Sequence, residues 1–201
     1  MLKRFQLLCA AAALALLVPI GAAALTISPN PQSFSNGTDA GTITLVGTAT
    51  GVPSGGTVLA GTVGASDVTL IFQVTVTSGA LESLGVGVTG INAPPFVSST
   101  GAGRIAGPDV DVTGVTGTAG TRIFDFDGDG QLDAGQTSDQ FFVSYASLPD
   151  DGTRQVNFMV NGSVGSDFTV SAVLEAPEPA LVGLLGLGFG ALLLSWRRRA
   201  R

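Results

Sequence analysis

The feature that most constrains the fold is a strict alternation of apolar and polar side chains. Between Val68 and Val76 every second residue is apolar, and threonine or glutamine occupies most positions in between. Successive side chains of a β-strand point to opposite faces, whereas a helix would need an apolar period near 3.6 residues. Similar alternation occurs in 141–145, 156–160 and 168–174, with shorter candidates at 42–48, 57–63 and 84–91.

Gly, Pro, Asn and Asp residues separate these segments at intervals of about 10 residues, a spacing typical of all-β proteins. We therefore expect an all-β domain that folds as an antiparallel β-sandwich. The pattern is weaker in 92–120, which fits either short edge strands or a long surface loop. The segment 27–41 is expected to be an irregular lead-in with at most one edge strand. The pattern does not specify the order of the strands.

The N-terminus has the three parts of a secretory signal peptide. Lys3 and Arg4 are followed by an apolar stretch from Leu7 to Ile20 and by small residues up to Ala24. We expect residues 1–24 to be removed after export. The only cysteine of the chain, Cys9, lies in this segment, so the mature protein would have neither a disulfide nor a reactive thiolate.

The C-terminus combines a short motif, an apolar span and a basic cluster. Pro177, Glu178 and Pro179 precede 17 uncharged residues, 180–196. As a helix this run would be roughly 25 Å long, close to the roughly 30 Å of a bilayer's hydrocarbon core. We therefore expect a transmembrane helix with a cytoplasmic basic stop. The residues of this stop are Arg197, Arg198, Arg199 and Arg201.

This order of parts, over residues 177–201, resembles the PEP-CTERM sorting signal of Gram-negative bacteria. Ala176 stands where that family often has Val. The resemblance implies cleavage near the motif by an exosortase, a membrane-embedded, transpeptidase-like enzyme. It also implies export across the inner membrane, a membrane-anchored stage, and a final place at the cell surface or outside the cell. Such proteins are associated with exopolysaccharide and biofilm matrix. The alternative is an ordinary C-terminal anchor that stays in place.

The predicted exported domain, residues 25–176, is strongly acidic. It has 14 acidic residues (the 15 of the chain without Glu178) and three arginines, a net charge of about −11. The arginines are Arg104, Arg122 and Arg154. This charge disfavours nucleic acid and anionic membrane surfaces as partners and favours divalent cations.

The segment 125–136 resembles the calcium loop of an EF-hand. Aspartates occupy its first, third and fifth positions, and Gly130 at the sixth permits a sharp turn. Alternate carboxylates in a tight loop can converge on one hard cation, while the seventh position contributes a backbone carbonyl. The residues that we expect to bind calcium are Asp125, Asp127, Asp129, Gln131, Asp133 and Gln136.

The loop departs from the EF-hand pattern in two respects. Its twelfth residue is Gln136 where a bidentate Glu is usual, although Asp139 could substitute in a reshaped loop. Its flanks have the pattern of strands, so it is closer to the loops of dockerin and thrombospondin repeats. We expect weak binding, with Kd about 10⁻⁴–10⁻³ M. The alternative is an acidic hairpin loop without an ion. Asp109 and Asp111 form a second alternating pair, which either contributes a ligand or is solvated.

The composition argues against an enzyme. The chain has no histidine, which excludes Ser-His-Asp and Cys-His catalysis and histidine-bound zinc. The domain has one tyrosine, Tyr145, and the only tryptophan lies in the tail, so a sugar-processing cleft would have few aromatic platforms. We expect a structural protein of the cell surface or matrix that calcium stabilises. The alternative is a calcium-dependent adhesin module that binds a glycan or a protein.

Overall fold

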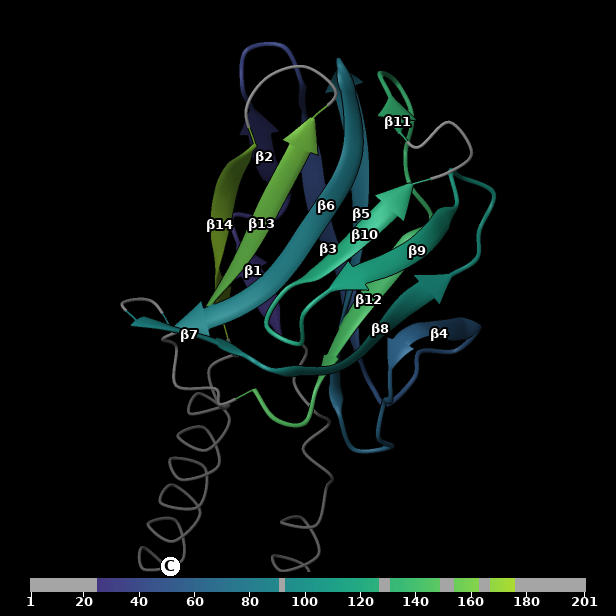
Figure 1. The fold of residues 1–201 in the computed structure, drawn as a ribbon, viewed down its shortest axis with the longest axis vertical. Coiled ribbons are helices and arrows are strands. Elements are labelled where there is room, and N and C mark those ends of the chain that lie inside the picture. Colours follow the sequence, from purple (N-terminus) through teal and green to yellow (C-terminus); the bar gives the residue numbers. More distant parts are fainter. Residues whose placement is uncertain (1–24, 91–92, 127–130, 149–153, 163–166, 176–201) are drawn as a thin grey trace, which may run out of the picture.

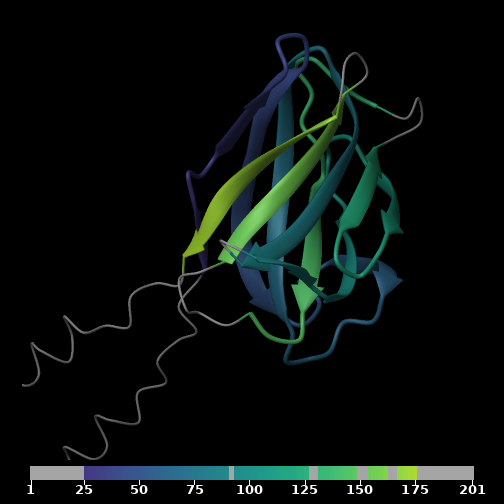
Figure 2. The ribbon, with the colours of Figure 1, turned by 60° about the vertical axis from the view of Figure 1, so that its left-hand side comes forward.

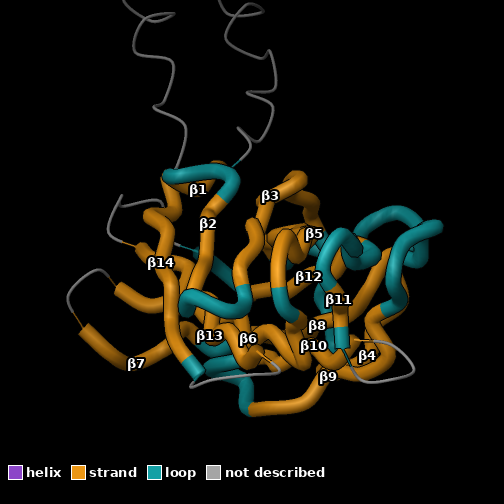
Figure 3. The backbone as a smooth tube through the Cα atoms, turned by 90° about the horizontal axis from the view of Figure 1, so that it is seen from above, coloured by secondary structure: helices purple, strands orange, loops and turns teal. Residues whose placement is uncertain are grey.

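The protein folds as two antiparallel β-sheets packed face to face, as the computed structural model shows (Figures 1 and 3). The structure describes residues 25–90, 93–126, 131–148, 154–162 and 167–175. The expected all-β sandwich is confirmed. The predicted signal peptide and sorting tail lie outside the described residues. Within the described ranges, no helix is long and apolar enough to cross a membrane.

Sheet A contains eight strands, all in antiparallel pairs. Its main path runs through β1 (Thr26–Ser28), β14 (Phe168–Glu175), β13 (Arg154–Gly162), β6 (Ala80–Gly90), β10 (Arg122–Phe126) and β9 (Val112–Gly117). Two further strands pair with β6 beside this path: β7 (Ala93–Val97) and β11 (Leu132–Asp133). The long strand β6 is therefore the centre of this sheet.

Sheet B contains six strands, also antiparallel. Their order is β2 (Gln32–Ser35), β3 (Ala40–Thr50), β5 (Val68–Ser78), β12 (Gln140–Tyr145), β8 (Ser99–Ile105) and β4 (Gly56–Gly61). Phe142 and Ser144, which the alternation placed on a solvent face, are buried, and a Cβ on Gly56 would lie 3.1 Å from the Phe142 ring.

The core lies between the sheets and consists of the inward side of each alternating strand. Phe72 of β5 and Phe158 of β13 meet edge to face across the sheets, with ring centroids 5.5 Å apart. Phe124 of β10 lies 4.6 Å from Phe141 of β12. All four rings are fully buried. Each such side chain contributes about 1.5–3 kcal/mol through burial, which makes this cluster the main link between the sheets.

The weakly patterned segments form more strand than expected. The segment 92–120 contains β7, β8 and β9, and β8 lies inside sheet B between β12 and β4 rather than at an edge. The lead-in 27–41 forms β1 in sheet A and β2 in sheet B, and so it connects the two sheets. The strands expected from clear alternation are all present.

Strand register defines two ends of the sandwich. Thr26 is paired with Glu175, so the described domain starts and finishes at the same end (Figure 2). We call this the terminal end. The turn at Gly79, strand β11 and the last residue of β10, Phe126, lie at the opposite end, which we call the loop end (Figure 1).

Candidate calcium loop

Asp125, the first residue of the predicted calcium loop, is the penultimate residue of β10. It pairs with Ser83 of β6 on one side and Gly114 of β9 on the other. The side chain is half-buried, and this burial raises the pKa of the Asp125 carboxyl because desolvation disfavours the charged form. A bound dication would favour the charged form and oppose that shift.

Gln131, Asp133 and Gln136 come together in a small turn at the loop end. The Asp133 amide donates to Gln136 Oε1 (2.6 Å), and Gln131 Nε2 donates to Asp133 Oδ1 (2.9 Å). Gly135 has a φ of +87°, which the turn requires and which a side chain would resist. The amide of Gly135 also donates to the Val76 carbonyl (2.8 Å), which fixes the turn to sheet B. One of the two lone pairs of Gln136 Oε1 is therefore already used by the Asp133 amide.

The structure brings together only part of the predicted ligand set. Asp127 and Asp129 lie outside the described residues. Among the residues that are described, no hydrogen bond joins Asp125 to the turn of Gln131, Asp133 and Gln136, and no group of three acidic, His or Cys side chains is close enough to hold a metal. Calcium binding by the complete set therefore remains a prediction from the sequence.

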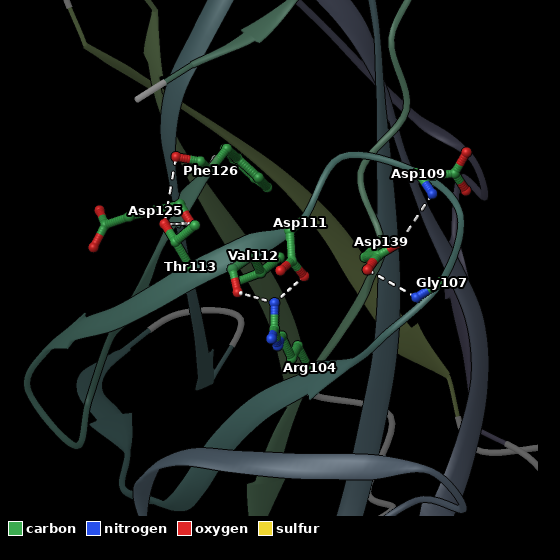
Figure 4. A network of polar contacts seen from close by, with 9 residues as sticks. All are labelled: Arg104, Gly107, Asp109, Asp111, Val112, Thr113, Asp125, Phe126 and Asp139. Atoms are coloured by element: carbon green, nitrogen blue, oxygen red, sulfur yellow. Dashed lines mark hydrogen bonds and ion pairs between the residues drawn. The ribbon is translucent and has the colours of Figure 1, made fainter. Parts of the chain in front are cut away.

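Asp139, the alternative twelfth ligand, has a different role (Figure 4). It is buried, and its two carboxylate oxygens accept the backbone amides of Gly107 (2.8 Å) and Asp109 (3.1 Å). It thereby anchors the loop between β8 and β9. Since its two oxygens already accept these amides and the carboxylate is buried, this placement does not favour Asp139 as a calcium ligand.

The second aspartate pair also has partners within the sandwich. Asp111 forms an ion pair with Arg104, whose Nη1 also donates to the carbonyl of Val112 (3.2 Å). Asp109 Oδ2 accepts a hydrogen bond from Gln73 Nε2 (3.3 Å). Figure 4 shows the Asp125 carboxylate turned away from those of Asp111 and Asp139. The pair at 109 and 111 is therefore better explained as a structural feature of the β8–β9 loop.

The sequence analysis did not identify Asp39 as a residue of interest. Asp39 is buried at the loop end and accepts the amide of Ala80 (3.1 Å) and the side-chain amide of Asn36 (3.1 Å). Asn36 Oδ1 in turn accepts the amides of Thr38 (2.9 Å) and Asp39 (2.7 Å). The Asn-x-x-Asp spacing was the available signal, because both residue types favour such local turns. Asp39 joins the β2–β3 turn to β6.

Comparisons with known proteins identify no relative of this chain. No protein-family model matches this chain, and no curated protein or solved structure matches it significantly. Function must therefore be inferred from residues and geometry.

Proposed function

We propose that this protein is an exported structural component of the cell surface or of an exopolysaccharide-containing matrix. Residues 177–201 act as its PEP-CTERM-like sorting signal in a Gram-negative bacterium. After transfer across the inner membrane, an exosortase-type enzyme cleaves near Pro177, Glu178 and Pro179. Calcium at 125–136 stabilises the sandwich.

The observation that carries this proposal is the pairing of Thr26 with Glu175. Because these residues lie side by side, a membrane anchor that follows Glu175 would hold the domain by its terminal end. The loop end, with the segment 125–136, would then face away from the membrane. Strand β14 is described up to Glu175, so cleavage near Pro177 would leave every strand of the described residues intact. The geometry is thus compatible with a domain that is first anchored and then released.

The sandwich edges also support a role as a durable matrix domain. Unpaired edge strands invite aggregation, and proteins limit this by making them short or covering them. At one edge of sheet A, β1 has only 3 residues. At the other edge, β9 lies beside β4, the last strand of sheet B. Uncontrolled strand pairing between neighbouring copies is therefore disfavoured, as a crowded matrix requires.

The second candidate function is that of a glycan-binding adhesin module. The observation that favours it is a trough on the outer face of sheet A, lined in part by Ser83, Asn161 and Asp167. Hydroxyl, amide and carboxylate groups of this kind are the groups that bind sugars.

The test of sorting is replacement of residues 177–179 by three alanines in a bacterium that has an exosortase. We expect the domain to stay with the membrane fraction, as the unchanged protein should in a strain that lacks the exosortase. The matched control replaces Gly183, Gly186 and Gly188 by alanine, which leaves the motif and the charges intact and should allow release. Unchanged release of the triple-alanine variant would show that the motif does not direct processing.

A further inference from the structure

The outer face of sheet A contains a trough over its central strand. Strand β6 alternates buried Leu84, Val86 and Val88 with glycines that occupy the outward positions. Gly85 forms part of the floor, and both Ile123 of β10 and Met159 of β13 are paired with it in register. These two side chains form apolar walls around a volume of about 220 Å³. A Cβ on Gly85 would already meet Met159 Cβ at 3.1 Å and Thr121 Cγ2 at 3.4 Å, so the trough lies beside this glycine rather than directly above it.

The rim of the trough at the loop end is polar. Ser83, Asn161 and Asp167 lie along it, and Asn161 Nδ2 donates to Ser83 Oγ (3.4 Å). Asp167 is exposed, so its carboxylate is accessible to a ligand. Toward the terminal end, Phe96 covers the next outward glycine, because a Cβ on Gly87 would lie 2.8 Å from the Phe96 ring. The Phe96 side chain is 39% exposed and adds an aromatic surface at that end.

The backbone pairing of β6 argues against an extended peptide as the occupant. Peptides that bind to sheets usually add as a strand at an edge, where backbone groups are free. Strand β6 is paired with β13 on one side and β10 on the other. A ligand in the trough must therefore be recognised by side chains alone. The hydroxyl and amide groups of the rim both donate and accept hydrogen bonds, which suits the hydroxyls of a sugar.

Charge selects among the possible sugars. The domain has a net charge of about −11, and none of its arginines lines the trough. Asp167 would repel a uronic acid and attract an ammonium group. Apolar walls beside a carboxylate and neutral polar groups fit a sugar ring that carries a free amine, since its C–H face can contact Ile123 and Met159.

We propose that the trough binds an amino-sugar unit of a polysaccharide. The ring lies between Ile123 and Met159, its ammonium group contacts Asp167, and its hydroxyls contact Ser83 and Asn161. The volume is below the roughly 300–1,000 Å³ of pockets for drug-sized ligands, so the trough holds about one ring and the polymer leaves through the open sides. This inference rests on the glycan-binding candidate function and depends on neither calcium nor tail processing.

The experiment is calorimetric titration of the full chain, purified in detergent with a chelator present, with a glucosamine hexamer. We expect saturable binding and at least tenfold weaker binding of Asp167→Asn, since a charge-assisted hydrogen bond contributes more than a neutral one. The N-acetylglucosamine hexamer should bind at least tenfold more weakly than the glucosamine hexamer. A galacturonate hexamer should not bind. The chelator separates this result from any failure of the calcium or sorting proposals.

Two further variants and one peptide make the test decisive. Glu175→Gln removes the same charge at the last residue of β14, the strand that follows Asp167, and should leave binding unchanged. Gly85→Val should push the Met159 side chain into the trough and abolish binding, and a melting curve checks that the variant folds. Absence of binding to the glucosamine hexamer would overturn the proposal, as would an equal loss in Asp167→Asn and Glu175→Gln. Equal binding of the acetylated hexamer, or Asp167-dependent binding of hexalysine, would also overturn it.

Discussion

At the scale of single residues, two buried hydroxyls differ in their partners. Thr69 Oγ1 donates to the Gly51 carbonyl (2.6 Å) and lies 2.7 Å from Ser144 Oγ. Tyr145 Oη is fully buried and has no hydrogen-bond partner among the described residues, and burial raises the pKa of Tyr145.

We expect Thr69→Val to lower the free energy of unfolding by about 1–3 kcal/mol, because it leaves buried partners unsatisfied. Tyr145→Phe should change it by less than about 0.5 kcal/mol.

Urea denaturation of the two variants, beside the unchanged protein, measures this difference. The two substitutions serve as controls for each other, since each removes one buried hydroxyl and roughly preserves shape. A loss of more than about 1 kcal/mol in Tyr145→Phe would indicate that the phenol oxygen has a partner in solution.

At the scale of elements, β8 shows where prediction from sequence failed. Strands with clear alternation, such as β5 and β13, were expected and are present. Strand β8 consists mostly of small residues and gave no such signal, yet it lies inside sheet B. Its apolar contact comes from a neighbour, because a Cβ on Gly103 would lie 2.7 Å from the Phe142 ring and would overlap the carbonyl oxygen of Thr57. The close approach of Phe142 and Thr57 to Gly103 depends on the tertiary structure, so the periodicity of the sequence does not reveal it.

This close approach predicts the effect of adding one methyl group. Gly103→Ala should push β4 away from β8, lower the free energy of unfolding by about 1–3 kcal/mol and speed hydrogen exchange of the β4 amides. Gly47→Ala is the matched control, since a Cβ there meets nothing within 4 Å. It should be neutral or slightly stabilising. Equal effects of the two substitutions on β4 exchange would show that Gly103 is not the contact that seats this strand.

At the scale of the whole molecule, composition predicted the character of the candidate sites but not their location. The acidic loop was visible in the sequence as aspartates at alternate positions. Its place at the end opposite the termini follows only from the pairing of Thr26 with Glu175 and of Asp125 with Ser83. The trough was not predicted, because its signal is two glycines at alternate positions of β6 in a chain with 29 glycines. The positions of both sites depend on the pairing register between strands that are distant in the sequence, and the local residue pattern does not contain this information.

Calcium binding is a property of the whole fold, because an ion that binds only the folded state raises its stability by mass action. At calcium about ten times the Kd, or about 10 mM at the weak end of the expected range, the stabilisation is about 1.4 kcal/mol. For a domain of this size the melting temperature should rise by about 3–6 °C. Asp127→Ala plus Asp129→Ala should remove this rise and leave the melting temperature in chelator unchanged.

The matched control is Asp150→Ala plus Asp151→Ala, which removes the same two charges outside the loop. Differential scanning fluorimetry of the full chain, with calcium and with chelator, compares the three proteins. If the control keeps its rise and the loop variant does not, the effect comes from ligation rather than from reduced repulsion among the domain's acidic residues. If all three rise equally, calcium acts by screening that repulsion, and the segment 125–136 is an acidic turn.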